Sequence, residues 1–366
     1  MSANARAKVT VVVSHLVPAL GMERSALRLV EALDGVFDVR VVSLAGGTAD
    51  TAVWPSVITA SSRQLTGLRR IASVLRARRL LRRDVSDVRV FVGAPAALAA
   101  LTATRPRGHL DVVWEHSLSA ERLRTSRPLQ LVWRVLARRY AQVGAVVAVS
   151  PPVADLMRTA APDRTVLVPN FVPPPTSARS ARRERDPGTV PARLLSVGAL
   201  STVKNHRALL DALVRLDPSV AATIVGAGPL REELEEQVRR LGLTDRVTFT
   251  GRLEPHAVDE LMRTSTLLVH PSTSETFGLV YFEAAAAGLP VVSTDHPVAR
   301  WLVPTFVPGL CVPQEELADG IRAALADPPD EDAWVRADAA RSASFDAAAT
   351  TAAWVDVVRS AAGLPR

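Results

Sequence analysis

The stretch TLLVHPSTSETFGLVYFEAAAAGLPVVSTD, residues 266–295, contains one complete repeat of an α/β fold. We predict a buried strand over 266–272, a polar loop over 273–278, a helix over 279–288 and a second buried strand over 289–295. Strands that are apolar throughout and alternate with helices are typical of a parallel sheet covered on both faces.

The same alternation runs through the rest of the chain. The apolar patterns predict further strands at 8–14, 37–44, 88–93, 111–117, 145–150, 192–200, 221–228 and 246–251. Amphipathic patterns predict helices between them, at 22–33, 130–142, 206–216, 230–242 and 258–265. Residues 173–192 are rich in Pro, Ser, Arg and Gly, a composition typical of a linker.

We therefore predict an α/β protein with two doubly wound, Rossmann-like domains that face each other across a cleft. The first domain covers residues 1–175, the linker covers 176–192, and the second domain covers 193–345. A cleft between two such domains is the expected ligand site.

The composition of the 366 residues is that of a globular protein, with 48% hydrophobic and 22% charged residues. The single cysteine, Cys311, excludes an intramolecular disulfide and fits a reducing compartment. No run approaches the ~18 to 20 apolar residues that span a bilayer. The β-branched segment KVTVVVSH, residues 8–15, favours a first strand over a signal peptide. We therefore expect a cytoplasmic protein.

The net charge of +7 is unevenly distributed. Residues 1–150 hold 22 Lys and Arg against 10 Asp and Glu, and residues 63–83 hold eight arginines and no acid. Such a stretch can be a solvated helix face, a membrane-surface patch or a nucleic-acid patch. Aromatic residues make up only 4%, and no nucleic-acid-reading motif is present, so we expect no nucleic-acid partner. Contact with an anionic membrane would make the protein peripheral at the inner face of the membrane.

The loop and helix at 273–288 also predict a binding site. The backbone amides of Phe277, Gly278 and Leu279 would be unpaired donors at a helix N-terminus, where phosphate or sugar oxygens bind readily. Glu275 precedes the helix, and Glu283 lies about one turn inside it, where both of its oxygens could reach a vicinal diol. From the spacing alone, two solvated glutamates beside a helix start would be the favoured interpretation.

A second glycine-rich turn, TIVGAGPLREEL, only partly matches a dinucleotide-binding fingerprint. Gly226 and Gly228 lie between a predicted strand and a predicted helix, but the position of the third glycine is occupied by Arg231. We predict a tight strand-to-helix turn without a nicotinamide site.

Residues 270–295 resemble the signature of the retaining family 4 glycosyltransferases, which have the GT-B fold. The shared features are HPS, two glutamates separated by seven residues, and the pattern AxxxGxPVV. Other segments resemble this family in the same order, namely PALGMERSALRLVEAL, DVVWEHS, AVVAVSPPVADLM, VLVPNFV, LLSVGALSTVKNHRALLDAL and TIVGAGPLREELEEQVRRLGLTDRVTFTGRL. The resemblance covers nearly the whole chain. It also implies that residues 346–366 form a helix that returns to the first domain.

The resemblance implies a set of donor-binding roles. Glu275 would contact the hydroxyls of the donor sugar, Glu283 the ribose, and Lys204 the departing diphosphate. The amides of Phe277, Gly278 and Leu279 would bind sugar and phosphate. The base would be lined by four consecutive residues, Thr250, Gly251, Arg252 and Leu253.

The remaining implied roles belong to the first domain and to the partners. Gly21 would keep the first loop clear of the diphosphate, and His116 would lie beside the anomeric carbon and the acceptor. The donor would be a UDP- or GDP-sugar, and the acceptor a sugar, a lipid-linked group or a small metabolite. No cofactor and no metal are implied. The alternative activities are a nucleotide-sugar epimerase or a phosphorylase on the same scaffold.

This sequence departs from the family pattern at two places. Ala199 stands where the family usually has an arginine that shares the diphosphate with the lysine. We expect His206, Arg207 or Arg24 to supply the second positive charge, unless the leaving group is held more weakly. The first loop has Leu20 before Gly21 in place of a glycine pair.

Overall fold

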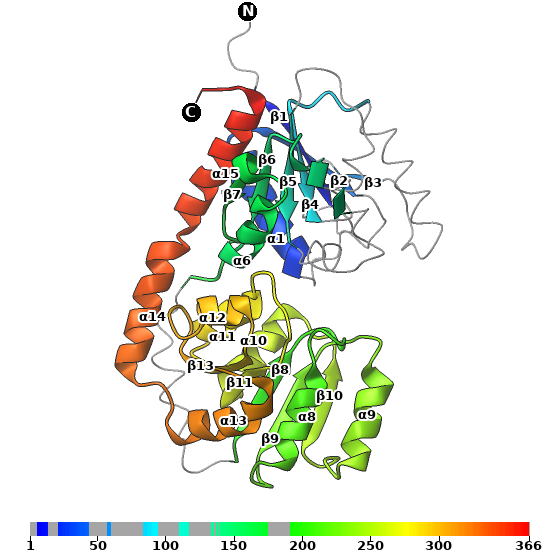
Figure 1. Cartoon of the computed structure of the whole chain (residues 1–366), viewed down its shortest axis with the longest axis vertical. Coiled ribbons are helices and arrows are strands. Elements are labelled where there is room, and N and C mark those ends of the chain that lie inside the picture. The colour runs from blue at the N-terminus through cyan, green and yellow to red at the C-terminus, as the bar shows by residue number, and fades with distance from the viewer. Residues whose placement is uncertain are drawn as a thin grey trace, which may run out of the picture. The chain divides into compact units, whose positions relative to one another are not determined.

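The computed structural model describes residues 6–13, 21–43, 57–59, 83–93, 110–116, 133–134, 137–138, 140–174 and 191–365. The chain divides into two compact units, of which the first contains residues 1–171 and 347–366 and the second residues 172–346. Figure 1 shows a sheet with accompanying helices in each unit. None of the helices in the described ranges is both long enough and apolar enough to cross a membrane.

The first unit is built on a parallel sheet with the order β3-β2-β1-β4-β5-β6-β7 among the described residues. Its strands are β1 (Lys8–Val13), β2 (Asp38–Ser43), β3 (Val57–Thr59), β4 (Val88–Val92), β5 (Leu110–Glu115), β6 (Ala145–Ala148) and β7 (Thr165–Leu167). Every residue of β4 and β6 is buried, because helices cover both faces of a parallel sheet.

Helices α1 (Gly21–Asp34), α6 (Pro151–Arg158) and α15 (Ala347–Ala362), with the short η2 (Pro162–Arg164), belong to the first unit. The buried residues of α1 recur at helical spacing and include Ala26, Leu29, Val30 and Leu33. The carboxy-terminal helix α15 packs against α1, β4 and β5. The ring of its Trp354 meets the ring of Trp114 on β5, with the centroids 4.9 Å apart.

The second unit has a parallel sheet with the order β10-β9-β8-β11-β12-β13. Its strands are β8 (Arg193–Val197), β9 (Ala221–Val225), β10 (Val247–Gly251), β11 (Leu267–His270), β12 (Val291–Thr294) and β13 (Gly309–Val312). The two doubly wound parallel sheets confirm the predicted fold class.

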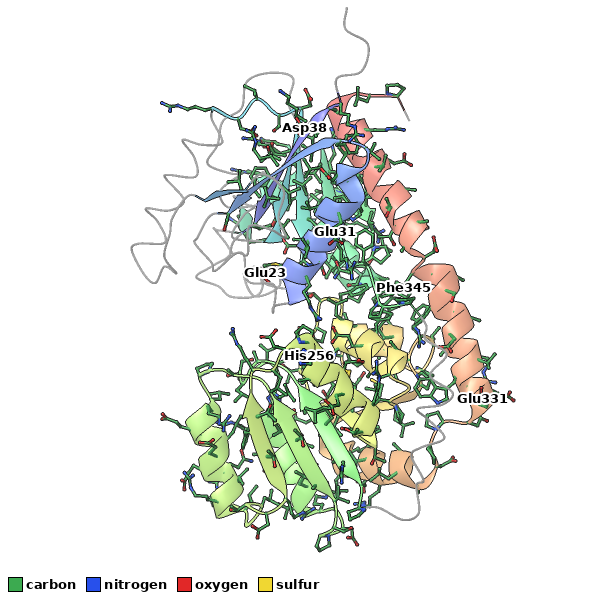
Figure 2. The ribbon with its side chains drawn as sticks, turned by 180° about the vertical axis from the view of Figure 1, so that it is seen from behind. Glu23, Glu31, Asp38, His256, Glu331 and Phe345 are labelled. Carbon is green, nitrogen blue, oxygen red and sulfur yellow. The ribbon has the colours of Figure 1, made fainter. Side chains whose placement is uncertain are left out.

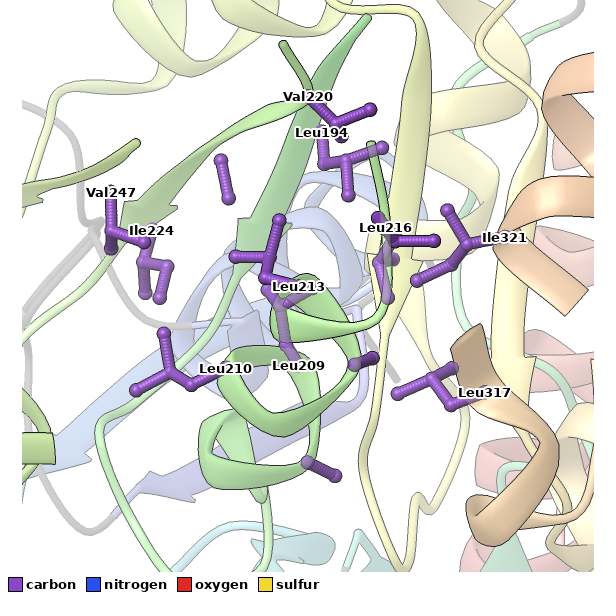
Figure 3. Packing of buried hydrophobic residues seen from close by; sticks show 14 of the residues in the cluster. Leu194, Leu209, Leu210, Leu213, Leu216, Val220, Ile224, Val247, Leu317 and Ile321 are labelled. Carbon is purple, nitrogen blue, oxygen red and sulfur yellow. The ribbon is translucent and has the colours of Figure 1, made fainter. Parts of the chain in front are cut away.

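The helices of the second unit are α8 (His206–Val214), α9 (Arg231–Arg240), α10 (Pro255–Thr264), α11 (Leu279–Ala286), α12 (Pro297–Leu302), α13 (Leu317–Ala326) and α14 (Glu331–Ser344), with the short η3 (Gln314–Glu316). One core cluster joins α8, α9 and α13 to the sheet, and Figure 3 shows Leu209, Leu213 and Ile321 within it. Each buried side chain of this kind stabilises the fold by about 1.5–3 kcal/mol. Right-handed crossovers place α10, α11 and α12 on the opposite face.

The sequence pattern does not predict all of these elements. Strands β3 and β7 are missed because they are only three residues long, and β13 is missed because it begins with a glycine. Helix α14 is missed because it buries only Trp334, Ala337 and Arg341 of its fourteen residues, which leaves almost no apolar periodicity. Helices α6, α12 and α13 are missed as well.

Several predictions fall outside the described residues. The basic stretch at 63–83 is described only at Arg83, and the predicted linker at 176–192 only at its last two residues. The loop before α1, including Leu20, also lies outside the described ranges.

Candidate active site

The candidate site lies at the point of the second sheet where the direction of winding reverses. Strands β8 and β11 are neighbours, but the chain leaves β8 toward β9 and leaves β11 toward β12, on opposite sides. In open parallel sheets, ligands usually bind at such a point, beside the loops that follow the two strands. Lys204 lies on the loop after β8, and Glu275 lies on the loop after β11.

The two loops are joined through one carbonyl group. The oxygen of Val203 accepts hydrogen bonds from the backbone N–H of Thr273 at 2.8 Å, from the Thr273 hydroxyl at 3.2 Å and from the Ser272 hydroxyl at 3.1 Å. Ser272 is fully buried, and its hydroxyl also lies 2.9 Å from the carbonyl oxygen of Ser274. These bonds fix the residue before Lys204 against the residues just before Glu275.

The carboxylate of Glu275 is held by two donors. Oε1 accepts a hydrogen bond from Nε2 of His270, at 2.6 Å, and forms an ion pair with the ammonium group of Lys204. The side chain of Glu275 is 11% exposed and that of Lys204 is 24% exposed, so both groups border on solvent. His270 ends β11 and is buried.

The protonation states follow from these contacts. Burial alone would raise the pKa of Glu275, but the charge of Lys204 and the hydrogen bond from His270 outweigh burial and hold this pKa well below its ordinary value. Burial lowers the pKa of His270, although Glu275 opposes the effect. At neutral pH the Glu275 side chain is therefore a carboxylate, and the His270 ring is a neutral imidazole.

The N-terminus of α11 lies directly after this carboxylate. Gly278 caps the helix with φ 76°, a left-handed conformation that favours glycine, and a Cβ there would lie 2.4 Å from the ring of Tyr281. Among the described residues, no acceptor is present for the amides of Phe277, Gly278 and Leu279. These amides are therefore unpaired donors at a helix N-terminus, a position where anions often bind.

An aromatic cluster fixes this helix N-terminus from behind. The ring of Phe277 is buried and stacks on Phe282, with the centroids 5.2 Å apart. It also meets the edges of Trp301 and Phe345 at 5.9 and 6.0 Å; Figure 2 labels Phe345 just before α15. Because the side chain of Phe277 is packed in this aromatic cluster, only the backbone of Phe277 is available to bind a ligand.

The other predicted donor-binding residues lie on neighbouring elements. Glu283 is half-buried within α11, one turn beyond its start. Thr250 and Gly251 end β10, and the exposed Arg252 follows with the half-buried Leu253. The carbonyl oxygen of Gly251 accepts the backbone N–H of Gly226 at 2.8 Å, which ties the end of β10 to the turn after β9.

The glycine turn after β9 serves packing. A Cβ on Gly226 would lie 1.9 Å from the carbonyl oxygen of Gly198, and one on Gly228 would lie 2.3 Å from that of Leu200. The turn therefore presses against the loop after β8, the loop that carries Lys204. This geometry agrees with the predicted tight turn.

Two of the three expected substitutes for the missing arginine do not provide a free positive charge. His206 is buried at the start of α8, and burial, with the neighbouring His270 and Lys204, lowers its pKa to about 4, so it is neutral at pH 7. The expectation for His206 is therefore wrong. Arg207 forms an ion pair with Glu233 of α9. Arg24 belongs to α1 of the first unit.

The first unit carries the two remaining predicted site residues. His116 directly follows β5, its ring contacts Trp114 with the centroids 4.2 Å apart, and burial lowers its pKa to about 3. Its Nε2 has no hydrogen-bond partner among the described residues. Gly21 is the first residue of α1, and burial raises the pKa of Glu23 in the same turn, which Figure 2 labels.

Sequence reasoning missed a polar network behind the carboxylate. The Tyr281 hydroxyl lies 2.7 Å from Ser293 Oγ and 3.2 Å from Nε2 of His296, and Ser293 Oγ donates to the carbonyl oxygen of His270 at 3.2 Å. Nδ1 of His296 accepts the backbone N–H of Ala299 at 3.2 Å and so caps α12. The letters HPS at the end of the strand were the only signal for His270, and they do not reveal its contact with Glu275.

Comparison with protein families gives two matches that together span most of the chain. Residues 179–341 match the family described as glycosyl transferases group 1, and residues 20–174 match glycosyltransferase family 4.

Individual relatives are similar mainly over part of their length. The alpha-monoglucosyldiacylglycerol synthase of Streptococcus pneumoniae is 33% identical over 141 residues, which cover 37% of this chain and 32% of that protein. The 2-deoxystreptamine N-acetyl-D-glucosaminyltransferase of Streptomyces fradiae is 35% identical over 133 residues, 35% of this chain and 32% of that protein. The chain thus matches about a third of the length of these curated relatives.

Solved structures match over nearly the whole chain. The crystal structure of Anabaena Alr3699/HepE in complex with UDP and glucose has a TM-score of 0.77 and 23% identity, and the match covers 97% of this chain and 100% of that one. This likeness shows that the two folds are the same.

Proposed function

The chain belongs to the group 1 glycosyltransferases and has the GT-B fold, and from this premise we propose that it transfers a hexosyl group from a UDP- or GDP-sugar to a hydroxyl acceptor with retention of anomeric configuration. UDP is the first choice, because the Anabaena structure contains UDP and glucose.

The observation that supports this proposal most directly is the meeting of Lys204 and Glu275 beside the free amides of α11. The ammonium group and the amides provide positive electrostatic potential for a diphosphate, and the carboxylate provides acceptors for sugar hydroxyls. We assign Glu283 to the ribose diol and Thr250, Gly251, Arg252 and Leu253 to the base.

The proposed chemistry is a same-face substitution. The bond between the anomeric carbon and the β-phosphate oxygen breaks, and the acceptor oxygen bonds to the anomeric carbon from the same side. The departing phosphate oxygen takes the proton of the acceptor hydroxyl. Lys204 and the α11 amides stabilise the charge that grows on the diphosphate, an effect often worth several kcal/mol. These groups belong to the protein itself, so we propose a reaction that needs no metal ion.

The acceptor side is assigned to the first unit. His116 is neutral at pH 7, and we propose that it acts there as a hydrogen-bonding group and not as a cation. Gly21, at the start of α1, leaves its position free of a side chain. The acceptor is a sugar, a lipid-linked group or a small metabolite, and the basic stretch at 63–83 would favour an anionic membrane surface as its setting.

A thermal-shift screen over UDP-, GDP- and dTDP-sugars tests the donor. A ligand at a hundred times its dissociation constant should stabilise the folded chain by about 2.7 kcal/mol. Stabilisation by none of them, together with a steep salt-dependent affinity for DNA, would contradict the proposal and favour a nucleic-acid-binding protein.

Product analysis then tests the reaction itself. The positive donor is incubated with and without acceptor in the presence of a chelator, and the anomeric configuration of the product is read by proton NMR. Retention with the chelator present supports the proposal, whereas an inverted linkage contradicts it. An epimerised donor formed without acceptor would identify an epimerase, and phosphate-dependent release of a sugar phosphate would identify a phosphorylase.

A further inference from the structure

We infer that His270 is a positioning residue, which keeps the carboxylate of Glu275 directed at the donor sugar when Lys204 turns to the leaving diphosphate. The inference rests on the proposed function and adds a residue that the family resemblance gave no role. It follows from the way in which the two donors share one carboxylate oxygen.

Both donors approach the same atom, Oε1 of Glu275. Among the described residues, His270 and Lys204 are the hydrogen-bonding partners of this carboxylate. A diphosphate carries more negative charge than one carboxylate, so its arrival draws the Lys204 ammonium away from Glu275. His270 then remains as the group that holds Oε1, and it leaves Oε2 free to accept a sugar hydroxyl.

His270 is itself held in place from several directions. It pairs with Ser293 in the parallel ladder between β11 and β12, and its carbonyl oxygen accepts the Ser293 hydroxyl at 3.2 Å. Its ring lies edge-on to Tyr281, with the centroids 5.0 Å apart, and is buried. The imidazole therefore has little freedom to turn away from Glu275.

The contact also defines the tautomer. An ionised carboxylate only accepts hydrogen bonds, so Nε2 of His270 carries the proton. Nδ1 is then bare in the neutral ring, and it is buried without a hydrogen-bond partner among the described residues. The group of His270 that serves Glu275 is therefore the Nε2–H donor.

Within the part of the chain that the structure describes, four ionisable groups lie around the His270–Glu275 pair. Lys204 approaches from the loop after β8, His206 from the start of α8, Tyr281 from α11 and His296 from the start of α12. Burial lowers the pKa values of His206 and His296 to about 4, and burial raises that of Tyr281, so all three are neutral at pH 7. Among these neighbours, Lys204 forms the ion pair with Glu275, and His270 is the neutral donor that remains after Lys204 has moved.

The test compares His270→Leu, which removes the donor, with His270→Gln, whose amide can place an N–H near the position of Nε2. We expect His270→Leu to lower kcat for the intact donor by about 10- to 100-fold, the scale of a small misplacement of a reacting group. The affinity for the bare nucleoside diphosphate should stay within about twofold, and His270→Gln should recover most of the lost turnover.

A double-mutant cycle separates positioning from a structural role. In a Glu275→Gln background, His270→Leu should cause little further loss, because His270 acts through that carboxylate. The inference would be overturned if the fold-losses in turnover of the two single variants multiplied in the double variant. It would also be overturned if His270→Leu turned over the donor at the wild-type rate. A wild-type protein that neither binds nucleoside diphosphates nor turns over nucleotide sugars would instead overturn the proposed function, and the inference with it.

A spectroscopic measurement covers the case in which His270→Leu does not fold. Nitrogen-15 NMR of the wild-type imidazoles should show His270 as the neutral tautomer protonated at Nε2, with a proton resonance that moves in Glu275→Gln. A proton on Nδ1, or a resonance unaffected by Glu275→Gln, would overturn the inference.

Discussion

The backbone N–H of Thr273 donates to the carbonyl oxygen of Val203 at 2.8 Å, and this bond joins the loop after β8 to the loop after β11. Lys204 is the next residue on one loop, and Glu275 lies two residues further on the other. The spacing between the proposed diphosphate ligand and the proposed sugar ligand is thus determined by backbone geometry and does not depend on long side chains alone.

Removal of the buried hydroxyl at this junction should loosen it. Ser272→Ala deletes the hydrogen bond to the Val203 carbonyl and should cost about 1 kcal/mol of folding stability. Because the Lys204 loop loses one of its attachments, we also expect nucleoside diphosphate to bind about 3- to 10-fold more weakly, the equivalent of about 1 kcal/mol.

Ser265→Ala is the matched control for this change. Ser265 is also buried, and its hydroxyl donates to the carbonyl oxygen of Leu261 at 2.6 Å, at the end of α10 and away from both loops. Its replacement should reduce stability similarly in urea titrations while leaving nucleotide affinity unchanged in calorimetry. An equal loss of affinity in both variants would contradict the role of the junction.

The ion pair of Lys204 with Glu275 makes Lys204 the central cation of the proposed diphosphate site. His206 is neutral, and Arg207 is engaged by Glu233. Lys204→Ala should lower turnover by at least ~100-fold, the scale observed when one preorganised donor to a developing oxyanion is lost. Lys8→Ala, at an exposed position on β1, should leave turnover unchanged. A loss below tenfold in steady-state kinetics would show that another cation carries the charge.

The two glutamates should separate nucleotide binding from sugar handling. Glu283→Ala should weaken binding of the bare nucleoside diphosphate by about 1.5 to 3 kcal/mol, because a ribose diol loses a charge-assisted acceptor. Glu283→Gln, which keeps one acceptor oxygen, should lose less.

Glu275→Ala should not weaken binding of the bare nucleotide, because removal of the carboxylate releases the Lys204 ammonium from its ion pair. The same change should lower turnover of the intact donor. Calorimetry and steady-state kinetics measure the two effects. An unchanged affinity of Glu283→Ala would rule out the ribose assignment.

The extent to which sequence predicted this site differs between its parts. The start of α11 at Leu279 and the glycine cap before it were predictable, because a glycine after polar residues and before an alanine-rich run is a local signal. The contact of His270 with Glu275 was not predictable from sequence, because it depends on the conformation of the loop over 271–274. The conformation of this loop is determined by hydrogen bonds to the carbonyl oxygen of Val203, about 70 residues earlier in the chain.

The error over His206 has a related cause. From the sequence it is a basic residue two positions after Lys204, and so a reasonable second cation. In the structure its ring belongs to the buried side of the first turn of α8, where desolvation removes the charge. Helical periodicity does not assign a side to the first residue of a helix, so the burial could be seen only in three dimensions.

The buried histidines should make stability depend on pH. Burial lowers the pKa of His296 from 6.5 to about 4, although nearby carboxylates oppose the effect. Between these values the unfolded chain binds a proton that the folded chain does not. Stability contributed by neutral His296 is therefore fully present above pH 6.5 and is lost as pH falls toward 4.

His296→Asn keeps a good helix cap and removes this titration. The decline of unfolding free energy with falling pH should become shallower by about 1.4 kcal/mol per pH unit in that window. Urea unfolding at several pH values measures the slope. His256→Asn, at an exposed position on α10 that Figure 2 labels, is the matched control for replacing a histidine by asparagine. An unchanged slope in His296→Asn would show that this histidine is not buried in its neutral form.

Ala199 occupies the position at which the resemblance to the family 4 glycosyltransferases implies an arginine. Ala199 is exposed on the loop after β8, two residues beyond the strand and on the same loop as Lys204. A longer side chain can leave this position toward solvent without entering the core. Ala199→Arg should therefore add a planar, bidentate donor next to the Lys204 ammonium and tighten nucleoside diphosphate binding by about 1.5 to 3 kcal/mol.

Ala199→Gln, of similar length but uncharged, is the control and should gain much less. The gain of the arginine variant should also shrink as salt is raised, because exposed charges are screened. Calorimetry at low and high salt measures both effects. Weaker binding by Ala199→Arg would show that the neighbouring space is already occupied by another cation, and Arg24 would then be the first residue to replace by alanine.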